Sequence, residues 1–73
     1  MNVGMMWYDS SAKSVEKKIT EGAEYYEKKY GRKPNSCVVN PEDFDKSISV
    51  DGITITQQKY ILKNIFWIGV SNG

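Results

Sequence analysis

Histidine is absent from this chain of 73 residues, and cysteine occurs once. Without histidine the chain lacks the commonest general base, the histidine-dependent nucleophile pairs of hydrolases and the usual nitrogen ligand of zinc. A single cysteine cannot form an internal disulfide, so the fold depends on its apolar core. Catalysis would rest on carboxylates, lysine or tyrosine, whose pKa values need large shifts to serve near neutral pH. We therefore expect a protein that is not an enzyme and that holds no metal or other cofactor.

Strong net charge and long apolar runs are missing as well. Ten Lys and Arg residues stand against nine Asp and Glu residues, so the formal net charge is +1 and no global field favours nucleic acid or anionic membranes. No stretch approaches the roughly 18 apolar residues of a membrane-spanning helix, and the first residues lack the basic and apolar regions of a signal peptide. This composition predicts a cytoplasmic protein with no membrane partner.

One segment carries a strong helical pattern. Its apolar residues recur at three- and four-residue spacings, as on one face of an α-helix. They are Val15, Ile19, Gly22, Ala23, Tyr26 and Tyr30. Polar residues 9–11 are competent N-caps, and Gly31 followed by Pro34 stops the helix. We predict a helix over residues 12–30.

Shorter segments after the helix predict strands. Residues 36–40 form an apolar strand, and residues 41–45 form a helical turn that opens with an Asn-Pro cap. Apolar residues alternate with Ser and Thr on either side of Asp51-Gly52, which predicts a hairpin over residues 47–56 with a two-residue type I′ turn. The apolar side chains of this hairpin should face the core and its Ser and Thr side chains the solvent. An apolar run over residues 65–70 is the terminal strand.

These segments together predict a single α+β domain over residues 1–73. One long N-terminal helix packs on a small, mainly antiparallel sheet that contains the hairpin. A domain of this length buries only about 60% of the surface of its unfolded chain, which leaves little room for a deep pocket. Gly22 lies on the apolar stripe of the helix, where it costs about 1 kcal/mol relative to alanine. We expect the backbone of the sheet to approach it closely. Cys37, within an apolar strand, is interpreted as a small buried hydrophobe.

Large apolar residues gather at both ends of the chain: Met5, Met6, Trp7, Tyr8, Ile65, Phe66, Trp67 and Ile68. Either the two ends pair as neighbouring strands and complete the core, or they form a surface for another chain. Because side chains alternate along a strand, one of two sets should point away from the core, Ile65 with Trp67 or Phe66 with Ile68. Aromatic residues and methionine are enriched at protein interfaces. The candidate interface residues are therefore Trp7, Phe66, Trp67 and Ile68.

Basic residues lie near tyrosines at the end of the predicted helix. The candidate nucleic-acid contacts are Lys28, Lys29, Arg32 and Lys33. Such a surface can hold phosphates while the tyrosine rings stack on bases, although neighbouring glutamates balance its charge. A nucleic-acid-binding accessory protein is therefore the alternative hypothesis. The leading one is a small, non-catalytic, intracellular binding or assembly module whose partner is itself or another protein.

Parts of the chain resemble known groups of proteins. The pattern Trp7-Tyr-Asp, Tyr25-Tyr-x-Lys-Lys-Tyr-Gly-Arg-x-Pro-Asn, Val38-Val-Asn-Pro and Phe66-Trp-Ile-Gly resembles short prokaryotic proteins of unassigned function. A long helix followed by Pro34-Asn-x-x-Val-Val-Asn-Pro-x-Asp-Phe is similar to the axial domain of tailed-phage major capsid proteins. The first resemblance implies no activity. The second implies assembly, although this chain lacks the remainder of a capsid subunit.

Overall fold

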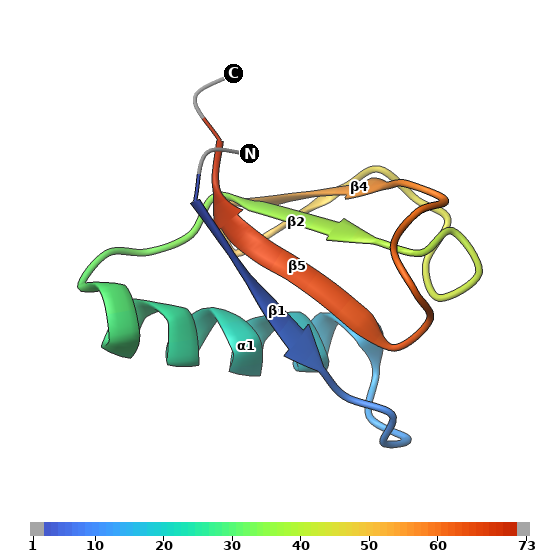
Figure 1. The fold of residues 1–73 in the computed structure, drawn as a ribbon, viewed down its shortest axis with the longest axis horizontal. Helices are drawn as coiled ribbons and strands as arrows, with labels where there is room; N and C mark the ends of the chain where they lie inside the picture. The colour runs from blue at the N-terminus through green and yellow to red at the C-terminus, as the bar shows by residue number, and fades with distance from the viewer. Residues whose placement is uncertain (1–2, 72–73) are drawn as a thin grey trace.

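One helix packs on one face of a five-stranded sheet in the computed structural model, which describes residues 3–71 (Figure 1). The elements in chain order are β1 (Val3–Tyr8), α1 (Val15–Tyr30), β2 (Ser36–Val39), β3 (Ser49–Val50), β4 (Ile53–Gln57) and β5 (Ile65–Val70). The ends of the predicted domain, residues 1–2 and 72–73, lie outside the described residues. In the part of the chain that is described, no helix is long and apolar enough to cross a bilayer.

The predicted α+β class is confirmed, whereas two finer features of the prediction are wrong. The helix lies in the middle of the chain, because β1 precedes it. The sheet is mixed, with the strand order β1-β5-β2-β4-β3. β2 and β4 run parallel, and the other neighbouring pairs are antiparallel. The parallel pair arises because residues 40–48 and β3 return the chain to the starting edge of β2 before β4 begins.

The two ends of the chain form neighbouring strands, as the first of the two alternatives proposed. In the antiparallel register of β1 and β5, Met5 lies opposite Ile68 and Trp7 opposite Phe66. β5 pairs with β2 on its other side. The predicted terminal strand is therefore an internal strand of the sheet, and β1 lies at its edge.

The helix starts later than predicted, and its end is where the sequence places it. Ser14 is the N-cap, and its hydroxyl oxygen accepts the Lys17 N–H at 3.1 Å. The predicted caps at residues 9–11 lie in the turn that precedes the helix. Gly31 caps the C-terminus with a φ of 76°, and its N–H donates to the Glu27 carbonyl at 2.8 Å.

The hairpin turn agrees with the prediction, although the paired strands are shorter. Asp51 and Gly52 have φ values of 51° and 78°, the two positive angles that a type I′ turn requires. Val50 lies opposite Ile53. The ladder does not extend over the whole of residues 47–56, because β3 comprises two residues only.

The core lies between α1 and the sheet. Its buried residues are Met5, Ile19, Tyr26, Cys37, Val39, Ile53, Ile55, Phe66, Ile68 and Val70. Gly22 is buried as well, and a Cβ at this position would lie 2.5 Å from Ile68 Cδ1 and 2.9 Å from Trp7 Cδ1. The close approach expected at Gly22 is therefore made by side chains of the sheet rather than by its backbone.

Candidate functional site

Among the described residues, no helix covers the second face of the sheet (Figure 1). We call this side the open face. Its strand residues alternate with those of the core and are exposed or half-buried: Met6, Tyr8, Ser36, Val38, Thr54, Thr56, Ile65 and Trp67. Met6 lies opposite Trp67, and Trp67 lies opposite Val38 on its other side. An apolar row therefore runs across three strands.

The segment between β4 and β5 borders this row. Tyr60, with 75% of its surface exposed, and the buried Ile61 line a depression of about 410 Å³ together with Met6, Val38 and Trp67. A second depression of about 470 Å³ adjoins it along Val38 and Tyr60 and continues over the Ser and Thr side chains of β2 and β4. All the described residues that line these two depressions are uncharged. The open face is thus apolar at one end and neutral polar at the other.

Hydrogen bonds from the 40–48 segment hold the bordering segment in place. The Asn40 side-chain amide donates to the Ile61 carbonyl at 2.7 Å, and the Asp43 carboxylate accepts the Asn64 N–H. The Ile61 N–H itself donates to the Gln58 carbonyl at 3.1 Å. These bonds position Ile61 against the sheet, so the open face has a defined shape at this end.

The structure divides the four predicted interface residues between the two faces. Trp67 lies half-buried on the open face. Phe66 and Ile68 point toward α1 and are 1% and 0% exposed, so in the folded chain they belong to the core. Trp7 also lies on the helix side, half-buried, with its ring centroid 5.4 Å from that of Tyr25. Ile65 and Trp67 are therefore the set that points away from the core.

The open face also contains residues that were not among the four interface candidates, of which Met6 and Tyr60 are the most exposed at the apolar depression. Met6 follows from the same alternation that places Trp67, once β1 is known to pair with β5 in register. Tyr60 carries no such signal, because it lies in a turn rather than in a strand. Its place beside Val38 depends on the hydrogen bonds of the bordering segment.

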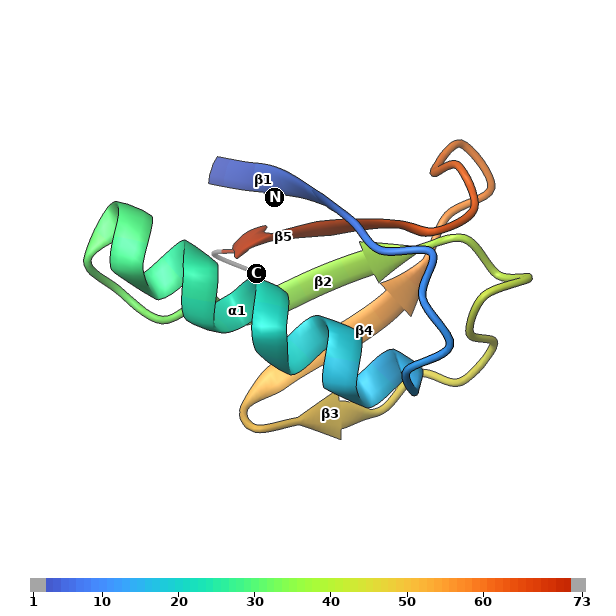
Figure 2. The ribbon, with the colours of Figure 1, turned by 90° about the horizontal axis from the view of Figure 1, so that it is seen from below.

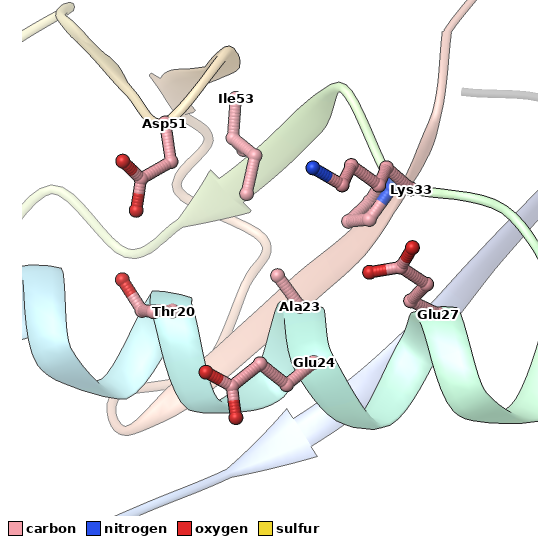
Figure 3. A pocket seen from close by; sticks show the side chains of 8 residues that line it. Thr20, Ala23, Glu24, Glu27, Lys33, Asp51 and Ile53 are labelled. Carbon is pink, nitrogen blue, oxygen red and sulfur yellow. The ribbon is translucent and has the colours of Figure 1, made fainter.

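The four predicted nucleic-acid contacts are exposed at the C-terminal end of α1 and in the loop that follows. Lys29 Nζ lies 5.5 Å from the ring centroid of Tyr30. Lys33 borders a groove of about 350 Å³ that Glu24, Glu27 and Asp51 also line (Figure 3). These carboxylates oppose the binding of a phosphate beside Lys33. Within residues 3–71, no cluster of His, Cys, Asp and Glu side chains is suited to hold a metal ion.

Cys37 is buried in the core, as interpreted from the sequence, and is 0% exposed. Burial raises the pKa of the Cys37 thiol to about 12, so the side chain is a neutral thiol at physiological pH. A neutral, inaccessible thiol is a poor nucleophile.

Comparisons of the chain with protein-family models, curated proteins and solved structures found no match. The resemblances to short prokaryotic proteins and to the phage axial domain stay predictions. The geometry itself defines a class of protein, a small α+β fold with one face covered by a helix and one open face that carries two depressions lined by uncharged residues.

Proposed function

We propose that this protein is a non-catalytic binding or assembly module that makes protein–protein contacts through its open face. The observation that carries the proposal is the apolar row of Met6, Trp67 and Val38, paired in direct register across three strands. Met6 leaves 62% of its surface in solvent and Tyr60 leaves 75%. Methionine, tryptophan and tyrosine are the types enriched at interfaces, and the two aromatic types often dominate binding energy.

The charge of the open face favours a protein over a nucleic acid. Binding to a phosphate backbone requires Lys or Arg side chains, and the described residues that line the open-face depressions include neither. The basic residues lie instead at the end of α1, where Lys33 is accompanied by carboxylates. The buried free thiol of Cys37 suits a reducing compartment, which supports an intracellular location for the module.

Site-specific photo-crosslinking in the native cells tests this function. A photoreactive phenylalanine analogue at position 60 lies at the open face, and the same group at position 28 lies on the exposed side of α1. We expect discrete protein adducts from position 60 and none from position 28. The position-60 adducts should disappear when Met6→Ser removes an exposed part of the apolar row.

Two results would contradict the proposed function. The absence of protein adducts at position 60 would show that the open face meets no partner. Nucleic-acid adducts at position 28 would favour the alternative, in which the exposed basic end of α1 is the binding surface.

A further inference from the structure

We propose that this module assembles with a second copy of itself by antiparallel pairing of the two β1 strands across a two-fold axis. This inference rests on the proposed function of a binding or assembly module and adds the β1 edge, beside the open face, as a second contact surface. The result is a continuous sheet through both copies, with their open faces on the same side.

The first observation is an unprotected edge. β1 and β3 are the edge strands of the sheet, and α1 lies across the strands between them (Figure 2). In the described chain, β5 is the one strand that pairs with β1. The sequence of β1, Val3-Gly-Met-Met-Trp-Tyr8, contains no charge and no proline. Edge strands that stay unpaired usually carry charged residues or proline, or are short like β3. These features prevent pairing with the edge of another chain, and β1 has none of them.

The second observation is the direction of the backbone groups of β1. The Asp9 N–H donates to the Asn64 carbonyl at 3.0 Å, which places Asp9 at a hydrogen-bonding position of the antiparallel register of β1 and β5. Because hydrogen-bonded and non-bonded pairs alternate along an antiparallel ladder, Met5 and Trp7 also bond to β5. The N–H and C=O groups of the residues between and beside them point outward. Those residues are Gly4, Met6 and Tyr8.

These outward groups are complementary to themselves. In antiparallel pairing, the register that places Met6 opposite the partner's Met6 also places Gly4 opposite the partner's Tyr8. Every outward N–H and C=O of the three residues then has a bonding partner in both copies. If one strand is shifted by two residues relative to the other, one outward residue of each copy is left unpaired. If it is shifted by one residue, the core side chains of one copy lie on the same side of the sheet as the open face of the other.

The side chains at this register fit as well. Gly4 leaves space for the aromatic ring of the partner's Tyr8, whose surface is 64% exposed in the single chain. An aromatic residue opposite a glycine is a favoured cross-strand pair at a sheet edge. The Met6 side chains of the two copies meet at the axis. The row of Met6, Trp67 and Val38 thereby continues into the row of the second copy.

Sedimentation equilibrium of the purified chain, with a proline variant, tests this pairing. Met6→Pro removes an N–H that points outward, so the hydrogen bonds between β1 and β5 are kept. We expect a dimer for the natural chain and an increase of about 100-fold in the dissociation constant for Met6→Pro, since the central hydrogen bonds of the pair are lost. Met6→Ala keeps the N–H and should weaken the dimer less.

The opposite edge supplies a matched control. The Ile55 N–H donates to the Ile48 carbonyl at 2.8 Å, so by alternation the Ser49 N–H on β3 points outward. Ser49→Pro therefore makes the same backbone change at an edge that the proposal leaves unpaired, and its dissociation constant should equal that of the natural chain. If Met6→Pro fails to fold by circular dichroism, a synthetic chain with an N-methylated Met6 amide replaces it.

The proposal is overturned if the natural chain is a monomer at millimolar concentration, or if Met6→Pro and Ser49→Pro dimerise equally. In either case, protein adducts at position 60 in cells would leave the proposed function standing with a different partner. A dimer that Met6→Pro spares and Trp67→Ser abolishes would show face-to-face association instead, and would likewise overturn the edge pairing.

Discussion

At the scale of single residues, Gly22 shows most clearly how the core is packed. The helix pattern alone places it on the apolar stripe, and its lack of a side chain predicts a close neighbour. Which neighbour it has depends on the register of β1 and β5, because that register brings Trp7 and Ile68 over the same turn of α1. A sequence read without this pairing can predict the contact at Gly22 but not its partners.

Gly22→Ala should destabilise the protein. The new methyl group would overlap the fully buried Ile68 and the ring of Trp7, and overpacking of this kind costs about 1–3 kcal/mol. Better helix propensity returns about 1 kcal/mol, so we expect a net loss of about 1 kcal/mol in the free energy of unfolding by urea denaturation. Glu24→Ala, on the exposed side of α1, should change it by less than about 0.5 kcal/mol. A stabilised Gly22→Ala variant would show that the packing over Gly22 is loose.

The Cys37 thiol predicts a specific loss of stability in alkali. The unfolded thiol ionises near its ordinary pKa of 9.0, whereas burial raises the pKa in the folded protein to about 12. Between these values the unfolded state loses a proton that the folded state keeps, so the free energy of unfolding falls as the pH rises. In Cys37→Ala this contribution is absent, while lysine and tyrosine titrate as before. A parallel pH dependence of unfolding in the two chains would contradict the burial of the thiol.

Lys18 shows where residue patterns mislead. Lysine is expected in solvent, yet Lys18 is only 7% exposed, and its Nζ lies 6.0 Å from the ring centroid of Phe66. Lys18 lies between Val15 and Gly22 on the buried side of α1. Its helical spacing therefore indicates a buried position, although its charge indicates an exposed one. A long lysine stem can cover apolar surface with its methylene groups.

Among the helices and strands, the sequence predicts an element's boundary correctly where one turn or cap residue determines it. The Asp51-Gly52 pair and Gly31 adopt the positive φ values that their positions predict. The start of α1 was missed because several polar residues before it can cap equally well, and only Ser14 has its hydroxyl oxygen on the Lys17 N–H. The end of a helix with one glycine is better determined than a start with many candidate caps.

Replacement of Gly52 tests the hairpin turn. Gly52→Val should lower the free energy of unfolding by about 1–2 kcal/mol, because a β-branched residue is strained at positive φ. No atom outside its chain neighbours lies within 4 Å of a Cβ at this position, so the cost is conformational and not steric. Gly52→Asn is the matched control, since asparagine tolerates this region and Asn64 already adopts a φ of 66° here. Equal losses for the two variants would contradict the type I′ turn.

At the scale of the whole molecule, the class of fold could be predicted and the order of strands could not. The elements from α1 to β5 have local signatures, but the sheet order β1-β5-β2-β4-β3 is set by pairings between distant segments. The parallel pair of β2 and β4 follows from the path of residues 40–48, where the sequence predicts a helical turn but not the direction in which the chain leaves it. The face of the sheet on which α1 packs then decides that Phe66 faces the core and Trp67 the open face.

For the candidate site, the sequence predicts that an interface exists but not which side chains form it. The surplus of apolar residues at the chain ends indicated an interface, and alternation required that one set of β5 side chains face away from the core. The choice of set depends on where α1 packs. The contribution of Tyr60 depends on a turn held by Asn40. Both depend on tertiary contacts, which composition and spacing do not contain.

Amide hydrogen exchange in β1, followed over a range of protein concentrations, shows whether the β1 strands of two copies pair. The amides of Met5 and Trp7 bond to β5 within one chain, so they should be protected at every concentration. The amides of Gly4, Met6 and Tyr8 point outward, and we expect their protection to appear and rise together as the concentration increases. Outward amides that exchange freely at the highest concentration, beside protected neighbours, would show that the β1 edge pairs with no second copy.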